Sequence, residues 1–541
     1  MLTQSKIQTM NGAKLVINTL KDLGVDTIFG YPGGVVLELY DELYKQNDIK
    51  HVLVRHEQSA THAAEGYART TGKCGVVLVT SGPGATNTIT GITNAYLDGY
   101  PLVVITGQVS QNLIGKDAFQ EANICDMTKS CTKKSFQISD IKNLQSTFYE
   151  AFEIANSGKK GPVVIDITKD IFCKNAEFNK SFNTQETVKS IDKISVSKIA
   201  DIINHSKKPV IITGGGVNHS QACEELQYFI NSTNIPVVST MMGLGAFNQQ
   251  DRHYLGMIGI FGNNAANNLI KKSDLIISLG ARLNDRITCM FDSEDLSSKL
   301  IQIDINEKEI SRVLTPKESI VCDIKDLLPI LMTSVNADFS DWLRQAQDFK
   351  ILNKTAIKSS NMIHSFEIIR TLDKITENKD IIFTSEVGQH QLWAIQNLHL
   401  NPDRKILLSG GAGTMGFGLP AAIGAAIANP KRPVVCITGD GSFQMSLHEL
   451  ATCKDYNLNI KILILNNGYL GMVRQLQQNK CDGRYSQTKI SNPDFVTLAQ
   501  SYGIKSSEVH SSTDIENALN KAFSTDETYI IDFKTEPYET L

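Results

Sequence analysis

Two short polar motifs, each at the end of an apolar run, have the residue types of a magnesium site. Gly439-Asp440-Gly441 follows residues 432–438, and Asn466-Asn467 follows residues 461–465. Both runs have the length and composition of buried strands. Because a doubly wound sheet binds ligands at the carboxyl ends of its strands, we expect Asp440 and Asn467 to face one pocket. Mg²⁺ takes carboxylate and amide oxygens as ligands when diphosphate oxygens and water complete its octahedron.

The glycines on either side of Asp440 indicate what the metal would hold. They allow a diphosphate to approach the backbone closely. A Gly-Asp-Gly tripeptide by itself is more often a simple turn, and it is the asparagine pair behind the second strand that favours a metal site. Together the motifs point to thiamine diphosphate. That cofactor requires, in addition, a glutamate from a different domain.

Glu57 is the glutamate that we predict for this role. It lies in Arg55-His56-Glu57-Gln58, directly after the strand-like residues 51–54. Thiamine diphosphate must lose the C2 proton of its thiazolium ring, and a carboxyl group that exchanges a proton with N1′ of the aminopyrimidine promotes that loss. Partial burial would hold this proton poised near neutral pH. The alternative is an ion pair with Arg55 or a helix N-terminal acid, since structural ion pairs are commoner than catalytic acids.

Composition is that of a large globular protein without obvious affinity for nucleic acid or membrane. The 541 residues, 41% hydrophobic and 20% charged, suffice for about three or four domains. The net charge of −4 and the lack of a long basic run argue against nucleic acid and anionic membrane as partners. The ten cysteines form no Cys-x-x-Cys pair, and residues 1–6 lack the apolar core of a signal peptide. These features predict a cytoplasmic protein with reduced thiols and a chain that begins near Met1.

The alternation of helix-like patterns and short buried strands predicts an α/β fold of three doubly wound parallel-sheet domains. We expect the domains at residues 1–174, 194–335 and 362–541, with linkers at 175–193 and, partly helical, at about 338–361. Beside the runs described above, the expected strands are residues 75–80, 102–106, 162–166, 209–213, 275–279 and 300–304.

Eight motifs, in this order along nearly the whole chain, resemble one family. They are residues 29–34 (Phe-Gly-Tyr-Pro-Gly-Gly), 55–57 (Arg-His-Glu), 80–87 (Thr-Ser-Gly-Pro-Gly-Ala-Thr-Asn), 105–109 (Ile-Thr-Gly-Gln-Val), 117–121 (Asp-Ala-Phe-Gln-Glu), 410–416 (Gly-Gly-Ala-Gly-Thr-Met-Gly), 439–444 (Gly-Asp-Gly-Ser-Phe-Gln) and 465–475 (Leu-Asn-Asn-Gly-Tyr-Leu-Gly-Met-Val-Arg-Gln). The set resembles the large, catalytic subunit of acetolactate (acetohydroxyacid) synthase, a thiamine diphosphate-dependent enzyme. The resemblance implies a pyrimidine-binding first domain, an FAD-binding central domain and a diphosphate-binding third domain.

The resemblance also implies roles for individual residues. Asp440, Asn467 and the carbonyl of Tyr469 would coordinate Mg²⁺. Met415 would lie under the bend between the cofactor rings, although a buried methionine is more often a core residue. Gln120 and Lys169 would act beside Glu57 on the substrate, although an isolated lysine is more often a solvated surface group. The remaining positions that would bind thiamine diphosphate are Pro32, Gly388, Gln389, His390, Gly439, Gly441, Ser442, Gly471 and Met472.

A second cofactor, FAD, is implied for the central domain. Gly214-Gly215-Gly216 follows a buried strand and suits dinucleotide phosphates, with a tight turn as the alternative. The other positions that match the family's flavin contacts are Thr240, Met241, Gly280, Arg282, Asp285, Arg286, Asp304, Ile305, Asp323 and, in the first domain, Lys159. In this family the flavin is chiefly structural, because the reaction involves no net redox change.

Several residues depart from the family pattern, and they cluster around acceptor and flavin. Leu476 replaces a usual tryptophan of the acceptor pocket, and Lys116 a usual threonine. Lys159, Phe261 and Thr168 replace a usual arginine, histidine and proline. The segment 536–541 also stops short of the part that helps close the active site in many relatives. Donor chemistry is therefore better supported than the identity of the acceptor.

The resemblance implies decarboxylation of pyruvate and transfer of its two-carbon unit to a second keto compound. With pyruvate as acceptor the product is 2-acetolactate, a precursor of branched-chain amino acids. Two alternatives stay open. One is a related carboligase with another acceptor, such as a keto-sugar nucleotide whose phosphate would meet Lys116. The other is a non-catalytic, cofactor-binding paralogue. We expect a homodimer or homotetramer, with a small regulatory subunit as a further partner.

Overall fold

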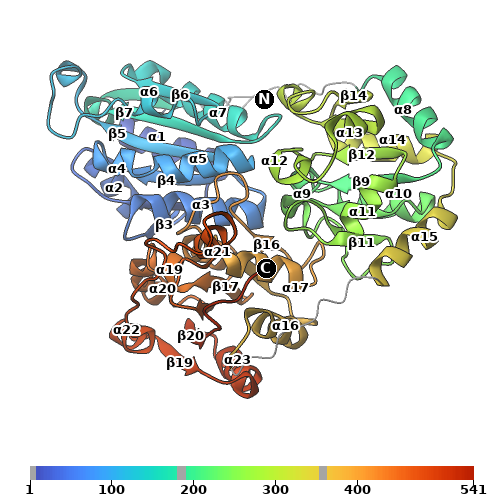
Figure 1. Ribbon diagram of the computed structural model, residues 1–541. Coiled ribbons are helices and arrows are strands. Elements are labelled where there is room, and N and C mark those ends of the chain that lie inside the picture. The colour runs from blue at the N-terminus through green and yellow to red at the C-terminus, as the bar shows by residue number, and fades with distance from the viewer. Residues whose placement is uncertain (1–7, 179–190, 352–361) are drawn as a thin grey trace. The chain divides into compact units, whose positions relative to one another are not determined.

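The chain forms three six-stranded parallel sheets. The computed structural model describes residues 8–178, 191–351 and 362–541 (Figure 1). The expected α/β class with three parallel sheets is confirmed. The expected start of the chain at Met1, residues 1–6, lies outside the described residues. The first and third sheets belong to one compact unit and the middle sheet to another, so each unit is described by itself.

The first sheet has the strand order β3-β2-β4-β5-β7-β6. Its strands are β2 (Thr27–Tyr31), β3 (Lys50–Leu53), β4 (Gly75–Val79), β5 (Leu102–Gln108), β6 (Lys134–Ile138) and β7 (Pro162–Thr168). The helices of this domain are α1 (Gly12–Asp22), α2 (Leu37–Tyr44), α3 (Glu57–Thr71), α4 (Pro83–Thr86), α5 (Ile89–Asp98), α6 (Ile124–Thr128) and α7 (Leu144–Asn156). The central strands β4, β5 and β7 are buried along their whole length, as expected for a parallel sheet covered on both faces.

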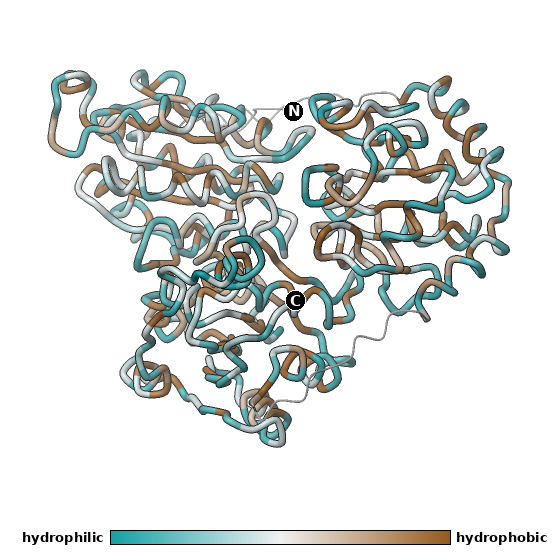
Figure 2. The backbone as a smooth tube through the Cα atoms, in the orientation of Figure 1, coloured by the Kyte–Doolittle hydropathy of each residue, from teal (hydrophilic) through white to brown (hydrophobic). Residues whose placement is uncertain are grey.

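The third sheet has the order β16-β15-β17-β18-β20-β19. Its strands are β15 (Ile382–Ser385), β16 (Ile406–Leu407), β17 (Val434–Gly439), β18 (Ile460–Asn466), β19 (Lys505–Val509) and β20 (Tyr529–Lys534). Its helices are α17 (Gln389–Asn397), α18 (Gly418–Ala428), α19 (Asp440–Phe443), α20 (Leu450–Asp455), α21 (Gly471–Lys480), α22 (Phe495–Ser501) and α23 (Ile515–Phe523). In Figure 2 the hydrophobic colour runs along inner strands and helices, and the hydrophilic colour marks many outer loops.

Helices α3 and α18 join the first and third domains at very close range. A Cβ atom on Gly66 of α3 would overlap the carbonyl oxygen of Ala421, and one on Gly424 of α18 would overlap that of Ala63. The facing positions are therefore glycine and alanine because the two backbones touch. Small residues at a helix crossing permit this approach.

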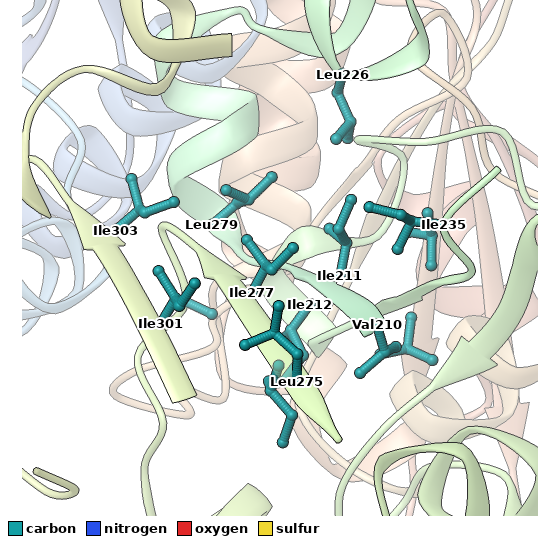
Figure 3. Packing of buried hydrophobic residues seen from close by; sticks show 14 of the residues in the cluster. Val210, Ile211, Ile212, Leu226, Ile235, Leu275, Ile277, Leu279, Ile301 and Ile303 are labelled. Carbon is teal, nitrogen blue, oxygen red and sulfur yellow. The ribbon is translucent and has the colours of Figure 1, made fainter. Parts of the chain in front are cut away.

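The middle sheet has the order β11-β10-β9-β12-β13-β14. Its strands are β9 (Pro209–Thr213), β10 (Val237–Ser239), β11 (Tyr254–Met257), β12 (Leu275–Leu279), β13 (Leu300–Asp304) and β14 (Glu318–Val321). Its helices are α8 (Lys193–His205), α9 (Gly215–Ser220), α10 (Cys223–Thr233), α11 (Asn264–Lys272), α12 (Asp285–Thr288), α13 (Ser293–Lys299), α14 (Ile324–Ser334) and α15 (Ser340–Ile351). Figure 3 shows how Ile211, Ile277 and Leu279 of neighbouring strands pack together in the core of this domain.

Both expected linkers contain more structure than a linker requires. Asn175–Phe178 is strand β8 and pairs antiparallel with β1 (Gln8–Asn11), whereas we expected a linker from residue 175. The segment after residue 338 is partly helical, as expected, because it contains α15. The indole of Trp342 in this helix is buried and donates a hydrogen bond to Pro209 O at 3.0 Å. Helix α16 (Ser365–Thr376) follows the second gap in the described chain.

Two further properties follow from the described residues. Within residues 8–178, 191–351 and 362–541, no helix is both long enough and apolar enough to span a lipid bilayer. All ten cysteines are free thiols, as expected from their scattered spacing.

Candidate active site

Asp440 and Asn467 lie side by side at the carboxyl edge of the third sheet. Strands β17 and β18 are parallel neighbours, and Gly439 stands opposite Leu465, so the residues that follow both strands emerge at one edge. The expectation that they come from neighbouring strands is therefore confirmed. Asp440 is buried, and its Oδ2 atom accepts hydrogen bonds from Gly468 N at 3.0 Å and from Asn492 Nδ2 at 2.7 Å. Burial raises the pKa of Asp440 to about 6, and a cation beside it would favour the charged form.

Asn492 is a site residue that the sequence motifs did not reveal. Its Nδ2 atom donates to Asp440 Oδ2 and, at 2.9 Å, to Asn466 Oδ1. Its own carbonyl oxygen accepts from Gln444 Nε2 at 2.8 Å. Asn492 thus ties the ends of β17 and β18 together from a loop, where no strand end or glycine turn marked it.

His390 faces the same edge with a free buried nitrogen. It follows β15, and burial lowers the pKa of its imidazole to about 3, so the ring is neutral. Among the described residues, no hydrogen-bond partner lies at His390 Nε2. A Cβ atom on Gly439 would lie 2.7 Å from His390 Nδ1, which explains the glycine at this position. An unsatisfied buried nitrogen beside two strand ends fits a polar ligand such as a diphosphate.

Gln389 lies next to His390, and its amide is held by two groups. Its Nε2 atom donates to Gln475 Oε1 at 2.7 Å and to Glu539 O at 3.1 Å. Arg474 Nη2 donates to the same Glu539 carbonyl at 2.9 Å. A Cβ atom on Gly471 would overlap Gln389 Oε1, so this glycine leaves room for the amide. Glu539 therefore reaches this edge.

The other residues predicted for the diphosphate and metal lie in the same region. Gly388 follows β15, Gly441 and Ser442 are in α19, Tyr469 lies between β18 and α21, and Met472 is in the first turn of α21. Ser442 Oγ donates to Gly439 O at 3.2 Å. The backbones of Gly468 and Leu470 bond to Ile490 and Thr488, on either side of Tyr469. These bonds fix the turn on which the Tyr469 carbonyl lies.

The turn that carries Met415 is held from the third domain by Glu386. This carboxylate is buried and accepts from Gly416 N at 2.7 Å, Gly418 N at 2.8 Å and Leu419 N at 3.3 Å. Burial raises the pKa of Glu386 to about 7, and the backbone amides oppose that rise. Met415 itself is half-buried, unlike an ordinary core methionine. Sequence reasoning missed Glu386, although it lies two residues before Gly388, the first of the diphosphate-binding residues predicted in this segment.

A buried ionic network holds the same turn from the first domain. Asp98 accepts from Gly410 N at 3.1 Å and from Gly411 N at 2.7 Å, and it pairs with Arg69 at 2.8 Å. Arg69 also pairs with Glu65. Because Glu65, Arg69 and Asp98 are almost completely buried, removing one partner would leave an uncompensated charge.

The carboxyl edge of the first sheet gathers the residues predicted for the pyrimidine and the substrate. Pro32 follows β2, Glu57 follows β3 after three residues, and Lys169 follows β7. Lys169 is half-buried rather than fully solvated.

The turn after β4 lies between Glu57 and Gln120. A Cβ atom on Gly84 would lie 3.5 Å from Glu57 Oε1, and one on Gly82 would lie 3.0 Å from Gln120 Cα. Gln120 has a φ angle of 62°, in the left-handed region that residues with side chains adopt only when their surroundings impose it. The structure therefore brings Glu57 and Gln120 to the two sides of one turn.

The two alternative roles for Glu57 have different outcomes. Arg55 pairs with Asp455 at 2.5 Å and not with Glu57, so the ion-pair alternative is wrong. Glu57 is nevertheless the first residue of α3, as the helix-terminal alternative required. Its Oε2 atom accepts from Asn87 Nδ2 at 3.0 Å. Across residues 8–178, 191–351 and 362–541, no hydrogen bond or ion pair joins Glu57 to Asp440 or Asn467.

The residues predicted for FAD in the middle domain lie at the carboxyl ends of five adjacent strands. Gly214–Gly216 follow β9, Thr240 and Met241 follow β10, Gly280, Arg282, Asp285 and Arg286 follow β12, Asp304 ends β13, Ile305 follows it, and Asp323 follows β14. The amides of Gly214 and Gly216 donate to Leu279 O and Gly280 O. A Cβ atom on Gly216 would lie 2.7 Å from Gly280 Cα. These two glycines allow the turns after β9 and β12 to approach each other closely.

Two positions that depart from the family pattern have local contacts. Lys159 Nζ lies 5.7 Å from the centre of the Tyr96 ring, within cation–π range. The carbonyl of Phe261 accepts from Gln396 Nε2 at 3.1 Å. Its aromatic side chain is not needed for that bond.

Comparison with known proteins matches this geometry to one family. The thiamine pyrophosphate enzyme models match in three parts: the N-terminal TPP binding domain at residues 10–127, the central domain at 196–331 and the C-terminal TPP binding domain at 386–533.

Individual relatives agree. The chain is 39% identical to the acetolactate synthase large subunit of Haemophilus influenzae, covering 96% of this chain and 93% of the relative. It is 40% identical to the isozyme 2 large subunit of Escherichia coli, covering 98% and 97%, and 41% identical to the large subunit of Lactococcus lactis, covering 96% and 92%. The chain therefore belongs to the acetolactate synthase large-subunit family of thiamine pyrophosphate-dependent enzymes.

Proposed function

We propose that this enzyme decarboxylates pyruvate and joins the two-carbon unit to a second 2-keto acid, giving 2-acetolactate for branched-chain amino acids. The observation that carries the proposal is the carboxyl edge of the third sheet. There Asp440 and Asn467 lie beside His390, whose buried Nε2 has no partner in the described chain. This donor set fits a diphosphate held by Mg²⁺.

Thiamine diphosphate, when bound, supplies a carbon that can take up the charge left by loss of CO₂. The chain supplies the ligands and the positioning. Asp440, Asn467 and the Tyr469 carbonyl would hold Mg²⁺. Gln389 and His390 would bind diphosphate oxygens, and Met415 would support the bent cofactor from its doubly anchored turn.

Glu57 would exchange a proton with N1′ of the aminopyrimidine. Glu57 is the first residue of α3, and its half-buried carboxylate accepts a hydrogen bond from Asn87. The start of the helix and this hydrogen bond together orient the carboxylate. Gln120, on the other side of the Gly82–Gly84 turn, and Lys169 would face the substrate. A lysine there stabilises negative charge that develops on the acceptor's carbonyl oxygen.

The acceptor is the part of the proposal with a second candidate. Leu476 leaves 45% of its surface exposed, and Lys116 is exposed on the segment that leads to Gln120. An exposed cation near the substrate residues favours an acceptor that carries phosphate, such as a keto-sugar nucleotide. The third alternative, a non-catalytic paralogue, is disfavoured because Glu57, Asp440 and Asn467 are all present.

The remaining cofactor and partners are also proposals. We propose FAD at the carboxyl edge of the middle sheet, where five strand ends converge, with Asp285 and Arg286 exposed for its polar groups. We propose at least a homodimer, with a tetramer and a small regulatory subunit as further assemblies. Ten free thiols favour a cytoplasmic location.

A comparison of two variants tests the central assignments. Glu57→Gln should retain thiamine diphosphate and Mg²⁺ but lose about 10²–10⁴-fold of turnover, because an amide cannot relay the proton. Asp440→Ala should fail to hold the cofactor at modest concentration. Binding is measured by calorimetry, and pyruvate consumption and 2-acetolactate formation are measured together. Glu508→Gln, in β19, is the matched control. Near wild-type turnover by Glu57→Gln would show that the assignment is wrong, and pyruvate consumption without acetolactate would favour the other acceptor.

A further inference from the structure

The carboxylate of Glu449 holds the turn from which Glu57 projects. Glu449 ends the 3-10 helix Leu447–Glu449 in the third domain, and its side chain is completely buried. Its Oε1 atom accepts from Arg55 N at 3.0 Å and from His56 N at 3.1 Å. These two amides directly precede Glu57 in the chain. Glu449 therefore binds the backbone of the first domain and not its flexible side chains.

The contact has a structural reason, because β3 is an edge strand of the first sheet. An edge strand presents unpaired amides and carbonyls, which must find other partners when they are buried. Tyr456 provides partners within the strand: its hydroxyl accepts a hydrogen bond from Leu53 N at 2.7 Å and donates one to His51 O at 3.2 Å. Glu449 provides the hydrogen-bond acceptor for the amides of Arg55 and His56, just after the strand.

The carboxylate itself is fixed by its neighbour. Thr452 Oγ1 donates to Glu449 Oε2 at 2.6 Å. A buried carboxylate is costly unless its oxygens are hydrogen-bonded. Here it accepts from two amides and one hydroxyl, and His448 Nε2 lies 3.4 Å from its Oε1 atom. Loss of the carboxylate would leave the half-buried amides of Arg55 and His56 without this partner beside Glu57 and free the turn to shift.

We infer that Glu449 is a positioning residue that sets the place of the Glu57 carboxyl group for proton exchange with the cofactor. The inference rests on the proposed role of Glu57. Tyr456 binds the same strand further from Glu57, at Leu53 and His51. The two residues therefore allow positioning to be separated from general stabilisation.

The test measures proton exchange at C2 of bound thiamine diphosphate in D₂O, by acid quench and NMR, with cofactor and Mg²⁺ saturating. Glu449→Asp withdraws the carboxylate by one methylene and keeps its charge. A misplacement of 1 Å at a reacting group can cost about 10²-fold, so we expect exchange to slow at least about tenfold. Glu449→Gln keeps an oxygen for both amides, and we expect it to stay within about threefold of wild type. The dissociation constant of the cofactor should be unchanged in both, because the proposed ligands of its diphosphate and of Mg²⁺ follow β15, β17 and β18.

Two further proteins complete the design. Tyr456→Phe leaves Leu53 N unpaired and should lower the melting temperature without slowing exchange at saturation. In the double variant Glu57→Gln with Glu449→Asp, the second change should have no further effect, because both changes act on the same group.

Each outcome has a separate meaning. Exchange at the wild-type rate in Glu449→Asp would overturn the inference, as would equal slowing in Tyr456→Phe or additive slowing in the double variant. If Glu57→Gln alone left exchange unchanged, the proposed role of Glu57 would fail instead. A loss of cofactor affinity in Glu449→Asp without slower exchange would also overturn the inference, because it would assign Glu449 to binding.

Discussion

Asn492 donates a hydrogen bond from Nδ2 to Asp440 Oδ2 at 2.7 Å, and with the same group it binds Asn466 at 2.9 Å. It therefore orients the carboxylate that we propose as a metal ligand. Loss of such an outer partner costs metal affinity about 10–100-fold in comparable sites. We expect Asn492→Ala to weaken Mg²⁺ binding by that factor in a titration of Mg²⁺ at saturating thiamine diphosphate, read by intrinsic fluorescence. Gln444→Ala removes the hydrogen bonds to Asn492 Oδ1 and to the Asp440 main-chain carbonyl but none to the Asp440 carboxylate, so it should have a smaller effect. Equal Mg²⁺ affinity in wild type and Asn492→Ala would contradict the expectation.

Mixing two inactive variants tests whether the site is shared between subunits. Glu57 and Asp440 share no hydrogen bond or ion pair within the described chain, and we propose that they meet across a dimer interface. A mixture of Glu57→Ala and Asp440→Ala protein, after subunit exchange, should recover part of the activity, because mixed dimers contain one intact site. The activity of the mixture is compared with that of each variant incubated alone. Subunit exchange demonstrated by labelled protein, without recovered activity, would exclude shared sites.

The side chain at position 476 should affect the choice between acceptors. A methylene difference in an apolar pocket is worth roughly 1–3 kcal/mol, and a tryptophan provides more surface for the ethyl group of 2-ketobutyrate than a leucine. We expect weak preference for 2-ketobutyrate over pyruvate in the wild type and a stronger preference in Leu476→Trp. Competition of both acceptors in one tube gives the product ratio directly. Leu476→Met, similar in volume, is the control, and strong 2-ketobutyrate selectivity in the wild type would defeat the idea.

Glu386 should make the free energy of unfolding depend on pH. Burial raises its pKa from 4.5 to about 7, so the folded protein holds this proton more tightly than the unfolded chain. The resulting stabilisation is complete below pH 4.5 and is lost as the pH rises to about 7. In this window wild type should lose stability relative to Glu386→Gln, by at most about 1.4 kcal/mol per pH unit for one proton.

The measurement is the difference in melting temperature between the two proteins at intervals from pH 4.5 to 8. Asp494→Asn is a suitable control. Hydrogen bonds from Thr497 and Val496 lower the pKa of Asp494, so the contribution of Asp494 is already complete above pH 4.5 and should give no slope in this window. A constant difference between wild type and Glu386→Gln would mean that this carboxyl does not titrate as described.

Much of the fold could be predicted from the sequence, because buried parallel strands are continuous apolar runs. The strands expected at residues 209–213, 275–279 and 300–304 have the bounds of β9, β12 and β13. The strand β8 was missed for the opposite reason. Its residues, Asn175–Phe178, alternate between exposed and half-buried, so they lack the apolar run and owe their conformation to pairing with β1.

The candidate site was predictable where residues follow a strand directly, as Asp440 and Asn467 do. It was not predictable where a residue acts from a distant segment. Asn492 and Glu449 come from loops or short helices, and their partners at Asp440, Arg55 and His56 are set by tertiary packing. Gly214 and Gly216 show that a recognised motif does not by itself determine its role. A glycine run permits phosphate binding, the contact of two turns, or both, and the contact with residues 279–281 could not be predicted from the sequence.

The crossing of α3 and α18 has a mechanical consequence. Glu57 begins one helix, and the Met415 turn leads into the other, while the backbones touch at Gly66 and Gly424 without any side chain between them. Because no side chains separate the two backbones at these positions, a displacement of one helix is passed directly to the other. An alanine at either glycine would push the two helices apart, and with them the Glu57 end of α3 and the Met415 turn before α18. In the proposed dimer these two ends of one chain serve two different sites, so two residues that never meet the substrate couple the geometry of both.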